Sequence, residues 1–247
     1  MMSNPSTHLP LQGRVILVTG AGQGLGRAAA KSFAAQGATV VLLGRTVPKL
    51  EAVYDEIVRA GGPQPAILPA ELAAAEDRDF DTLAHTIASQ LGRLDGILHC
   101  ANAFAALSPL SMQTVEQWLI QFRVNTVAPF SINRACMPLL KQSEDASVIL
   151  VGETHGHEPA AYWGGFAVSK AALEAYFRIQ ADEWSDLPNL RINLVIPGPI
   201  RSPLRARTHP AEDQGSLPQP ESLCPLLLQL MGPEGRDTRG EILSFRP

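Results

Sequence analysis

The 247-residue sequence has few cysteines, no long apolar run and no concentration of basic charge. Its three cysteines, Cys100, Cys136 and Cys224, are odd in number and widely spaced, which argues against a disulfide framework or a zinc ligand set and indicates a reducing compartment. No apolar stretch reaches the roughly 18 residues of a membrane span, and the polar N-terminus lacks the apolar core of a secretory signal. We therefore expect a soluble, cytoplasmic protein.

The charge and composition of the chain indicate what kind of partner it binds and how many domains it forms. With a formal net charge of −4 and no basic run, we expect neither nucleic acid nor a membrane surface as partner, which leaves a small-molecule substrate of unknown identity. A hydrophobic fraction of 45% suffices for the core of one large domain. We expect a flexible N-terminal tail over residues 1–11 and a single dinucleotide-binding domain over residues 12–247.

Short aliphatic runs alternate with longer segments of helical period along the chain. This rhythm predicts a Rossmann-type, doubly wound α/β fold, with a parallel seven-stranded sheet and helices on both faces. The expected strands lie at residues 15–18, 39–43, 66–68, 97–99, 147–151, 192–196 and 242–245, and the expected helices at residues 25–35, 47–60, 77–90, 115–140 and 166–184. Residues 201–220 lack strong periodicity and follow a strand end where such sheets bind ligands, so a mobile lid or an ordinary surface loop is expected there.

The first expected strand runs directly into the glycine-rich turn Thr19-Gly20-Ala21-Gly22-Gln23-Gly24-Leu25-Gly26, and a helix follows. Glycines permit a tight turn and bring the backbone close to a pyrophosphate, whose charge the N–H groups of a helix N-terminus stabilise. Strand, turn, helix and second strand occur in the required order. The turn therefore predicts a dinucleotide site.

The spacing T-G-x-x-x-G-x-G resembles the cofactor signature of the short-chain dehydrogenase/reductase family, and the resemblance covers essentially the whole chain. Residues 94–102 resemble the family's fourth strand and N-N-A-G motif, and residues 197–202 resemble the segment after its sixth strand. Residues 42–45, 162–164 and 230–233 resemble a bacterial YciK-like branch of the family. The resemblance implies cofactor-binding roles for Gly20, Gly22, Gln23, Gly24, Leu25, Gly26, Arg45, Thr46, Glu71, Leu72, Cys100, Ala101, Asn102, Lys170, Pro197, Gly198, Ile200 and Ser202.

The end of the second expected strand reads Gly44-Arg45-Thr46 and offers no carboxylate. A carboxylate there would bind a ribose 2′-hydroxyl, whereas an arginine fork suits a 2′-phosphate. NADP(H) is therefore favoured over NAD(H), with a solvated surface Arg45 as the alternative. Glu71-Leu72 resembles the family's adenine-contacting D-L pair with one extra methylene.

The catalytic pattern of the family is incomplete in this chain. The resemblance places Asn125 and Lys170 at two catalytic positions, but Phe166 stands where the family has its tyrosine and Glu153 where it has its serine. Losing the phenol raises the barrier by roughly 3–5 kcal/mol, because general acid–base catalysis contributes about 10²–10⁴-fold. Tyr162 precedes Lys170 by eight residues, a spacing that turns it away from that helix face.

The two retained positions do not by themselves imply turnover. In the family the lysine also hydrogen-bonds the nicotinamide ribose, a role that needs no tyrosine. Asn125 holds a relay water in the family, but an asparagine can equally satisfy backbone groups where its helix bends. The segment His99-Cys100-Ala101-Asn102 departs from the N-N-A-G pattern at its second and fourth positions, Cys100 and Asn102. Cys100 is expected to be a small buried hydrophobe.

The segment Glu153-Thr154-His155-Gly156-His157-Glu158 admits three interpretations. Glu153 or His155 replaces the missing acid/base group, His155 and His157 bind a metal with a carboxylate, or the segment is a polar loop facing solvent. We expect no metal site. We expect an NADP(H)-binding family member whose ancestral carbonyl reduction and alcohol oxidation are impaired or altered, with a non-catalytic binding module as the alternative. The helices expected from residues 115 and 166 resemble those through which the family pairs, which predicts a homodimer or homotetramer.

Overall fold

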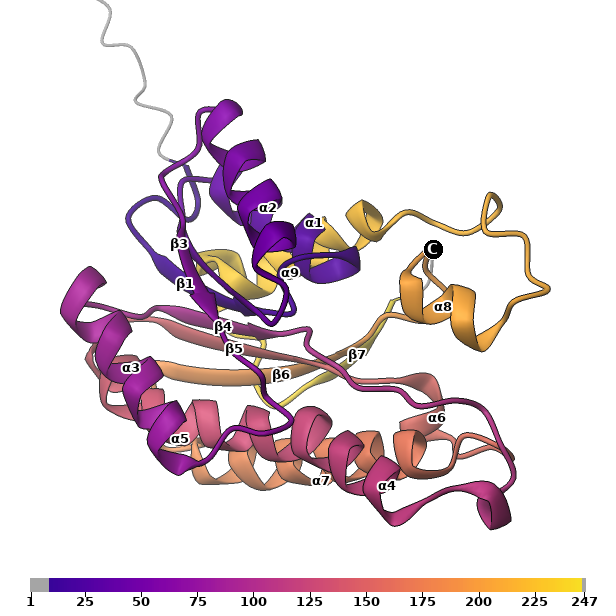
Figure 1. Cartoon of the computed structure of the whole chain (residues 1–247). Coiled ribbons are helices and arrows are strands. Elements are labelled where there is room, and N and C mark those ends of the chain that lie inside the picture. Colours follow the sequence, from indigo (N-terminus) through magenta and orange to yellow (C-terminus); the bar gives the residue numbers. More distant parts are fainter. Residues whose placement is uncertain (1–8, 246–247) are drawn as a thin grey trace, which may run out of the picture.

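One parallel sheet organises residues 9–245, the part of the chain that the computed structural model describes (Figure 1). The strands are β1 (Val15–Thr19), β2 (Thr39–Gly44), β3 (Ala66–Pro69), β4 (Gly96–His99), β5 (Ala146–Val151), β6 (Leu190–Ile196) and β7 (Ile242–Ser244). Their order is β3-β2-β1-β4-β5-β6-β7, and every pairing is parallel. The order reverses between β1 and β4, which creates the crevice where open α/β sheets bind ligands. The predicted fold class and all seven predicted strands are confirmed.

Alternate side chains of the strands enter two separate cores, one on each face of the sheet. Ile16 and Val18 of β1 face one core, whereas Val15 and Leu17 face the other. The first core is covered by α1 (Gly24–Ala35), α2 (Val47–Arg59) and α9 (Cys224–Met231). The second lies under α3 (Asp77–Leu91), α4 (Val115–Phe122), α5 (Ala128–Gln142) and α7 (Gly164–Glu183) (Figure 1).

Local sequence signals set the ends of these helices. Thr114 caps α4 by accepting a hydrogen bond from the Gln117 amide, and the Gln117 side chain accepts in return from the Thr114 amide. Gly92 ends α3 with a positive φ of 71°, a conformation that glycine adopts at little cost. Capping therefore explains why these helices begin and end where they do.

The single helix predicted over residues 115–140 is interrupted. Between α4 and α5 lies a wider turn, η2 (Arg123–Val127), of the π type. The physical reason is Pro129, which has no N–H to donate to the carbonyl four residues before it, that of Asn125. Helical structure continues to Gln142, so the prediction that this segment is helical is confirmed. The prediction of one continuous α-helix was wrong, because a π-helical turn divides it.

The described residues include short helical elements that the sequence analysis did not predict. They are α6 (Thr154–His157), α8 (Pro203–Thr208), η1 (Leu110–Met112), η3 (Pro220–Leu223) and η4 (Pro233–Gly235), together with α9. Figure 1 shows α8 beyond the carboxyl ends of the strands. The segment expected to be a lid therefore carries a short helix over the edge where ligands bind. Within residues 9–245 there is no helix with the length and apolar character that a bilayer crossing requires.

The tail predicted over residues 1–11 was extended too far. Leu11 is fully buried in the core beside α1 and α9, and its amide donates to the Gln36 carbonyl oxygen at 3.0 Å. A buried leucine stabilises the fold by roughly 2 kcal/mol, so position 11 belongs to the domain. Residues 1–8 of the predicted tail lie outside the described residues.

Candidate functional site

A cavity of about 570 Å³ opens at the carboxyl edge of the sheet, above the reversal of strand order. The ends of β1, β2, β4, β5 and β6 contribute to it, and α8 lies against it. It is lined by nearly all of the residues that the sequence predicted for the site: Gly20, Gly22, Gln23, Gly24, Leu25, Gly26, Arg45, Thr46, Glu71, Leu72, Cys100, Ala101, Asn102, Glu153, Phe166, Lys170, Pro197, Gly198, Ile200 and Ser202. Only Asn125 of the predicted set lies outside the lining.

The glycine turn brings backbone close to backbone at one end of the cavity. Gly20 has a φ of 67°, and a Cβ there would meet the Ala101 amide nitrogen at 2.9 Å. A Cβ on Gly26 would collide with the Gly20 carbonyl oxygen. The turn thus leaves room for a ligand at the start of α1, where the first N–H groups of a helix have no partner within the helix. The backbone geometry fits a pyrophosphate.

Positive side chains surround the end of β2. Arg45 is exposed at this point, and no acidic residue of β2 or of the turn into α2 stands beside it in the lining. Lys49, which the sequence analysis missed, also lines the cavity and donates from Nζ to Gln23 Oε1 at 2.6 Å. The sequence could have indicated this role, because Lys49 lies only four residues after Arg45, in the first turn of the helix that follows β2. Two cations at this place suit a phosphate on the ribose.

Phe166 and Lys170 lie one turn apart on α7, on the same side of that helix. The Phe166 ring is 1% exposed and packs edge-on against Phe104, with 5.3 Å between ring centroids. Phe166 therefore seals a wall of the cavity where the resemblance places a hydroxyl. Burial lowers the pKa of Lys170 to about 8, while the nearby Glu153 carboxylate acts in the opposite direction.

Glu153 is half-buried and directly precedes α6. It lines the cavity beside Lys170, whereas His155 does not line it: the imidazole of His155 lies against the indole of Trp163, with centroids 4.1 Å apart. Of the two candidate acid/base replacements, the arrangement favours Glu153. Residues 154–157 form the short helix α6, whereas the third interpretation takes the segment as a polar loop.

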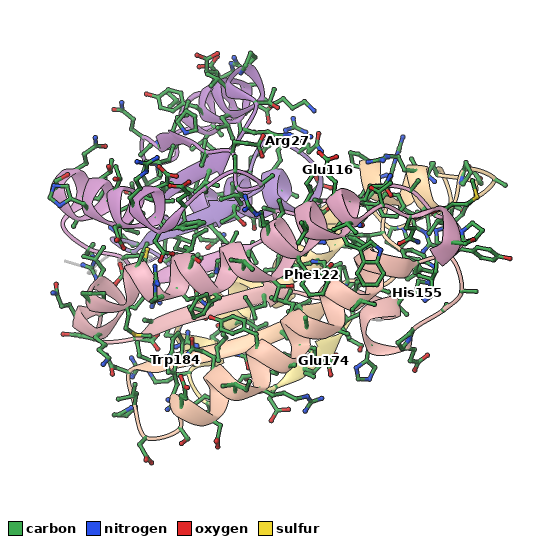
Figure 2. The ribbon with its side chains drawn as sticks, turned by 60° about the horizontal axis from the view of Figure 1, so that its bottom comes forward. Arg27, Glu116, Phe122, His155, Glu174 and Trp184 are labelled. Carbon is green, nitrogen blue, oxygen red and sulfur yellow. The ribbon has the colours of Figure 1, made fainter. Side chains whose placement is uncertain are left out.

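The metal interpretation of this segment has no geometric support. His157 Nδ1 lies 2.9 Å from Glu174 Oε2 on α7, and Figure 2 shows Glu174 apart from His155. No three His, Cys, Asp or Glu side chains within residues 9–245 form a group that could hold a metal ion.

Asn125 satisfies backbone groups. Its Oδ1 accepts from the Ala103 amide at 2.7 Å, and its Nδ2 donates to the Ala103 carbonyl oxygen and to Ser169 Oγ, each at 2.9 Å. These contacts agree with the second interpretation of this asparagine and fix the loop after β4 to α7. Tyr162 is 59% exposed and outside the cavity lining, in line with the argument from its spacing.

Two ionisable groups at the end of β4, Cys100 and His99, lie in an apolar environment. Burial raises the pKa of Cys100 to about 12, which keeps its thiol protonated and fits the expected small hydrophobe. Burial likewise lowers the pKa of His99 to about 4, and His99 Nε2 lies 2.9 Å from Asn133 Oδ1. Ser202 caps α8 by accepting from the Arg205 amide at 3.0 Å.

Known proteins resemble this chain along its length. The family model of short chain dehydrogenases matches residues 14–213. An uncharacterized oxidoreductase of Escherichia coli (strain K12), YciK, is 38% identical over 237 residues, covering 96% of this chain and 93% of the relative. A short chain dehydrogenase structure from Shigella flexneri 2a complexed with NADP is 36% identical with a TM-score of 0.94, covering 98% of this chain and 100% of that one. One from Escherichia coli CFT073 complexed with NADPH is 37% identical with a TM-score of 0.93 and the same coverage.

Proposed function

The chain belongs to the short-chain dehydrogenase family, and from this membership and the cavity geometry we propose that it binds NADP(H). The N–H groups at the start of α1 would hold the pyrophosphate, Arg45 and Lys49 the 2′-phosphate, and Lys170 the nicotinamide ribose. The complexes of two similar structures with NADP and NADPH support this choice of dinucleotide. When bound, the cofactor would supply a hydride donor or acceptor.

We propose further that the family's carbonyl reduction and alcohol oxidation are impaired or altered in this chain. The observation that carries the proposal is the buried Phe166 ring one turn before Lys170. A phenyl group has no proton to give to a developing alkoxide, so the proton must come from another group or the reaction slows by about 10²–10⁴-fold.

Glu153 is the group that we propose for any altered proton transfer. Its carboxyl lines the cavity beside Lys170, and a carboxyl group can give or accept a proton where the family uses hydroxyls. The alternative function is a non-catalytic module that binds the dinucleotide and responds to it. The absence of any proton-bearing group on Phe166 and on Phe104, which packs against it, favours that alternative.

Two measurements test the proposed function. Titration with NADPH and NADH, followed by nicotinamide fluorescence, should show tighter binding of NADPH; absence of NADPH binding contradicts the cofactor assignment. Turnover of a panel of aldehydes and ketones should then be slow in the wild type and lost in Glu153→Gln. Fast turnover that survives this substitution contradicts both the impairment and the role of Glu153. NADPH binding with no turnover supports the non-catalytic alternative.

We also propose a homodimer or homotetramer that pairs through the outer layer of α4, α5 and α7. Large apolar side chains are exposed along this layer, which Figure 2 shows from its outer side. They are Val115, Leu119, Val127, Phe130, Val168 and Ile179. Exposed large apolar side chains that gather on one layer of a folded domain support an association surface there.

A further inference from the structure

Arg207 is an exposed cation of α8 that lines the cavity near its aromatic wall. Its guanidinium carbon is 5.0 Å from the centroid of the Phe104 ring, and its Nη2 donates to the Ala105 carbonyl oxygen at 2.7 Å. Within residues 9–245 no carboxylate forms an ion pair with it. The fork is thus held in place by a ring and a carbonyl, while its charge is not neutralised.

A neighbouring arginine on the same helix shows the contrast. Arg205 also lines the cavity, but Nε and Nη2 of Arg205 both pair with the Glu212 carboxylate, at 2.6 and 2.7 Å. A bidentate pair of this kind uses the face of the guanidinium that would otherwise bind a ligand. Of the two arginines, only Arg207 offers an available charge to the cavity.

The wall next to Arg207 is apolar and aromatic. The rings of Phe104 and Phe166 meet edge to face at 5.3 Å, and Trp163 lies 6.3 Å from Phe104. Leu204 of α8 packs against the same cluster. A flat apolar group of a ligand gains both burial and ring contacts against such a wall. The wall and the fork are continuous, because Arg207 lies over Phe104.

We propose that this end of the cavity binds a flat, apolar carboxylic acid, with its carboxylate on Arg207 and its apolar body against Phe104 and Phe166. The arginine fork matches the two oxygens of a carboxylate. The charge of Lys170 is offset by the Glu153 carboxylate, and that of Arg205 by Glu212, so among residues 9–245 Arg207 is the cation near this wall that remains for a ligand carboxylate. The inference rests on the proposed function, since it names the substrate class of the proposed oxidoreductase site. The carboxylate only anchors the ligand, so a substrate of this class also carries a separate carbonyl or hydroxyl group for hydride transfer.

The test compares two probes of the same flat skeleton, cinnamate and cinnamyl alcohol, by isothermal titration calorimetry with and without saturating NADPH. The wild type should bind cinnamate about tenfold more tightly than the alcohol, because a charge-assisted pair is present only with the acid. Arg207→Gln should remove this difference and leave cinnamyl alcohol binding unchanged. Arg207→Lys should keep part of it, since lysine retains the charge but not the fork.

Arg201→Gln is the matched control, because Arg201 is an exposed arginine of the same segment that does not line this cavity. It should leave the preference for the acid intact. Equal binding of both probes by the wild type, no binding of cinnamate, or an unchanged preference in Arg207→Gln each overturns the inference. NADPH titration of every variant shows that the fold is retained. The same titration separates a failure of the proposed function from a failure of the acid site. A wild type that does not bind NADPH contradicts the proposed function, whereas acid binding is also measured without cofactor and tests the Arg207 site by itself.

Discussion

Lys170 donates a hydrogen bond from Nζ to the carbonyl oxygen of Val151 at 2.8 Å. The ammonium thus has a fixed partner at the end of β5 that does not depend on a tyrosine. Its retention is compatible with holding a cofactor and carries no implication of hydride transfer. The group that decides between these roles is the ring one turn earlier, Phe166.

Restoring the two missing hydroxyl groups should restore NADPH-dependent reduction of carbonyl compounds. In Phe166→Tyr combined with Glu153→Ser, a phenol stands one turn from Lys170, whose ammonium favours the phenolate because of its charge. We expect the rate of NADPH oxidation with aldehydes and ketones to rise by about 10²–10⁴-fold, measured by the loss of reduced-nicotinamide absorbance. Phe166→Leu with Glu153→Ser is the control without a phenol, and an equal rate in both double variants contradicts the prediction.

Arg45 should discriminate between the two dinucleotides. Charge-assisted hydrogen bonds contribute roughly 1.5–3 kcal/mol, so Arg45→Gln should weaken NADPH binding by about tenfold or more and leave NADH binding nearly unchanged. Arg59→Gln, at the far end of α2 and outside the cavity lining, should change neither affinity. A similar loss for both cofactors means that Arg45 does not contact the 2′-phosphate.

The buried His99 should make the fold acid-sensitive. Burial, assisted by the charge of Lys170, lowers its pKa from 6.5 to about 4, so between these values the unfolded chain binds a proton that the folded chain excludes. The free energy of unfolding should therefore be unaffected by this group above pH 6.5 and fall by about 3 kcal/mol as the pH drops to 4.

Chemical denaturation at a series of pH values tests this, with His99→Gln as reference. Glutamine keeps an amide to pair with Asn133 but does not titrate, so the variant should lose less stability across the window. Parallel curves for the two proteins contradict the prediction. The paired carboxyls of Glu56, Glu174 and Glu212, whose pKa values lie below 4.5, also lose part of their stabilising effect near pH 4. They do so in both proteins, so the difference between the two curves reports His99 alone.

Sequence periodicity was sufficient for the sheet, because buried parallel strands such as β1 read as continuous aliphatic runs. The glycine turn and the expected cofactor-binding residues could also be predicted from the sequence. Most of them directly follow the predicted strands, and the carboxyl ends of parallel strands meet at one edge of the sheet. Contacts between distant segments were not accessible. Nothing local in the sequence indicates that Arg207 meets Phe104, or that Asn125 holds Ala103.

Short elements were missed where tertiary contacts override weak local signals. The α6 segment reads as a polar loop, yet Gly156 packs so closely on Lys170 that a Cβ would lie 2.6 Å from the lysine Cβ. Leu11 lies in a polar stretch, so its burial against α1 and α9 could not be read from its neighbours. Both cases depend on partners far along the chain.

The corrected boundary of the tail can be measured. Leu11→Ala should lower the free energy of unfolding by roughly 2–5 kcal/mol, because the side chain is fully buried in a packed core. Leu9→Ala is the control, since Leu9 is 40% exposed, and its effect should be well under half as large. Equal denaturant midpoints for the two variants would contradict the assignment of Leu11 to the folded domain.

Two single substitutions to arginine, one on each face of the sheet, test the proposed association surface. Ile179 is 60% exposed on the outer side of α7, and Val58 is 46% exposed on α2, which covers the opposite face of the sheet. A charged side chain buried in an apolar interface without a partner costs several kcal/mol, so Ile179→Arg should shift the protein to monomers in analytical ultracentrifugation. Val58→Arg introduces the same charge on a surface outside the proposed interface and should leave the assembly intact. If the wild type sediments as a monomer, or if both variants behave alike, α7 does not form the interface.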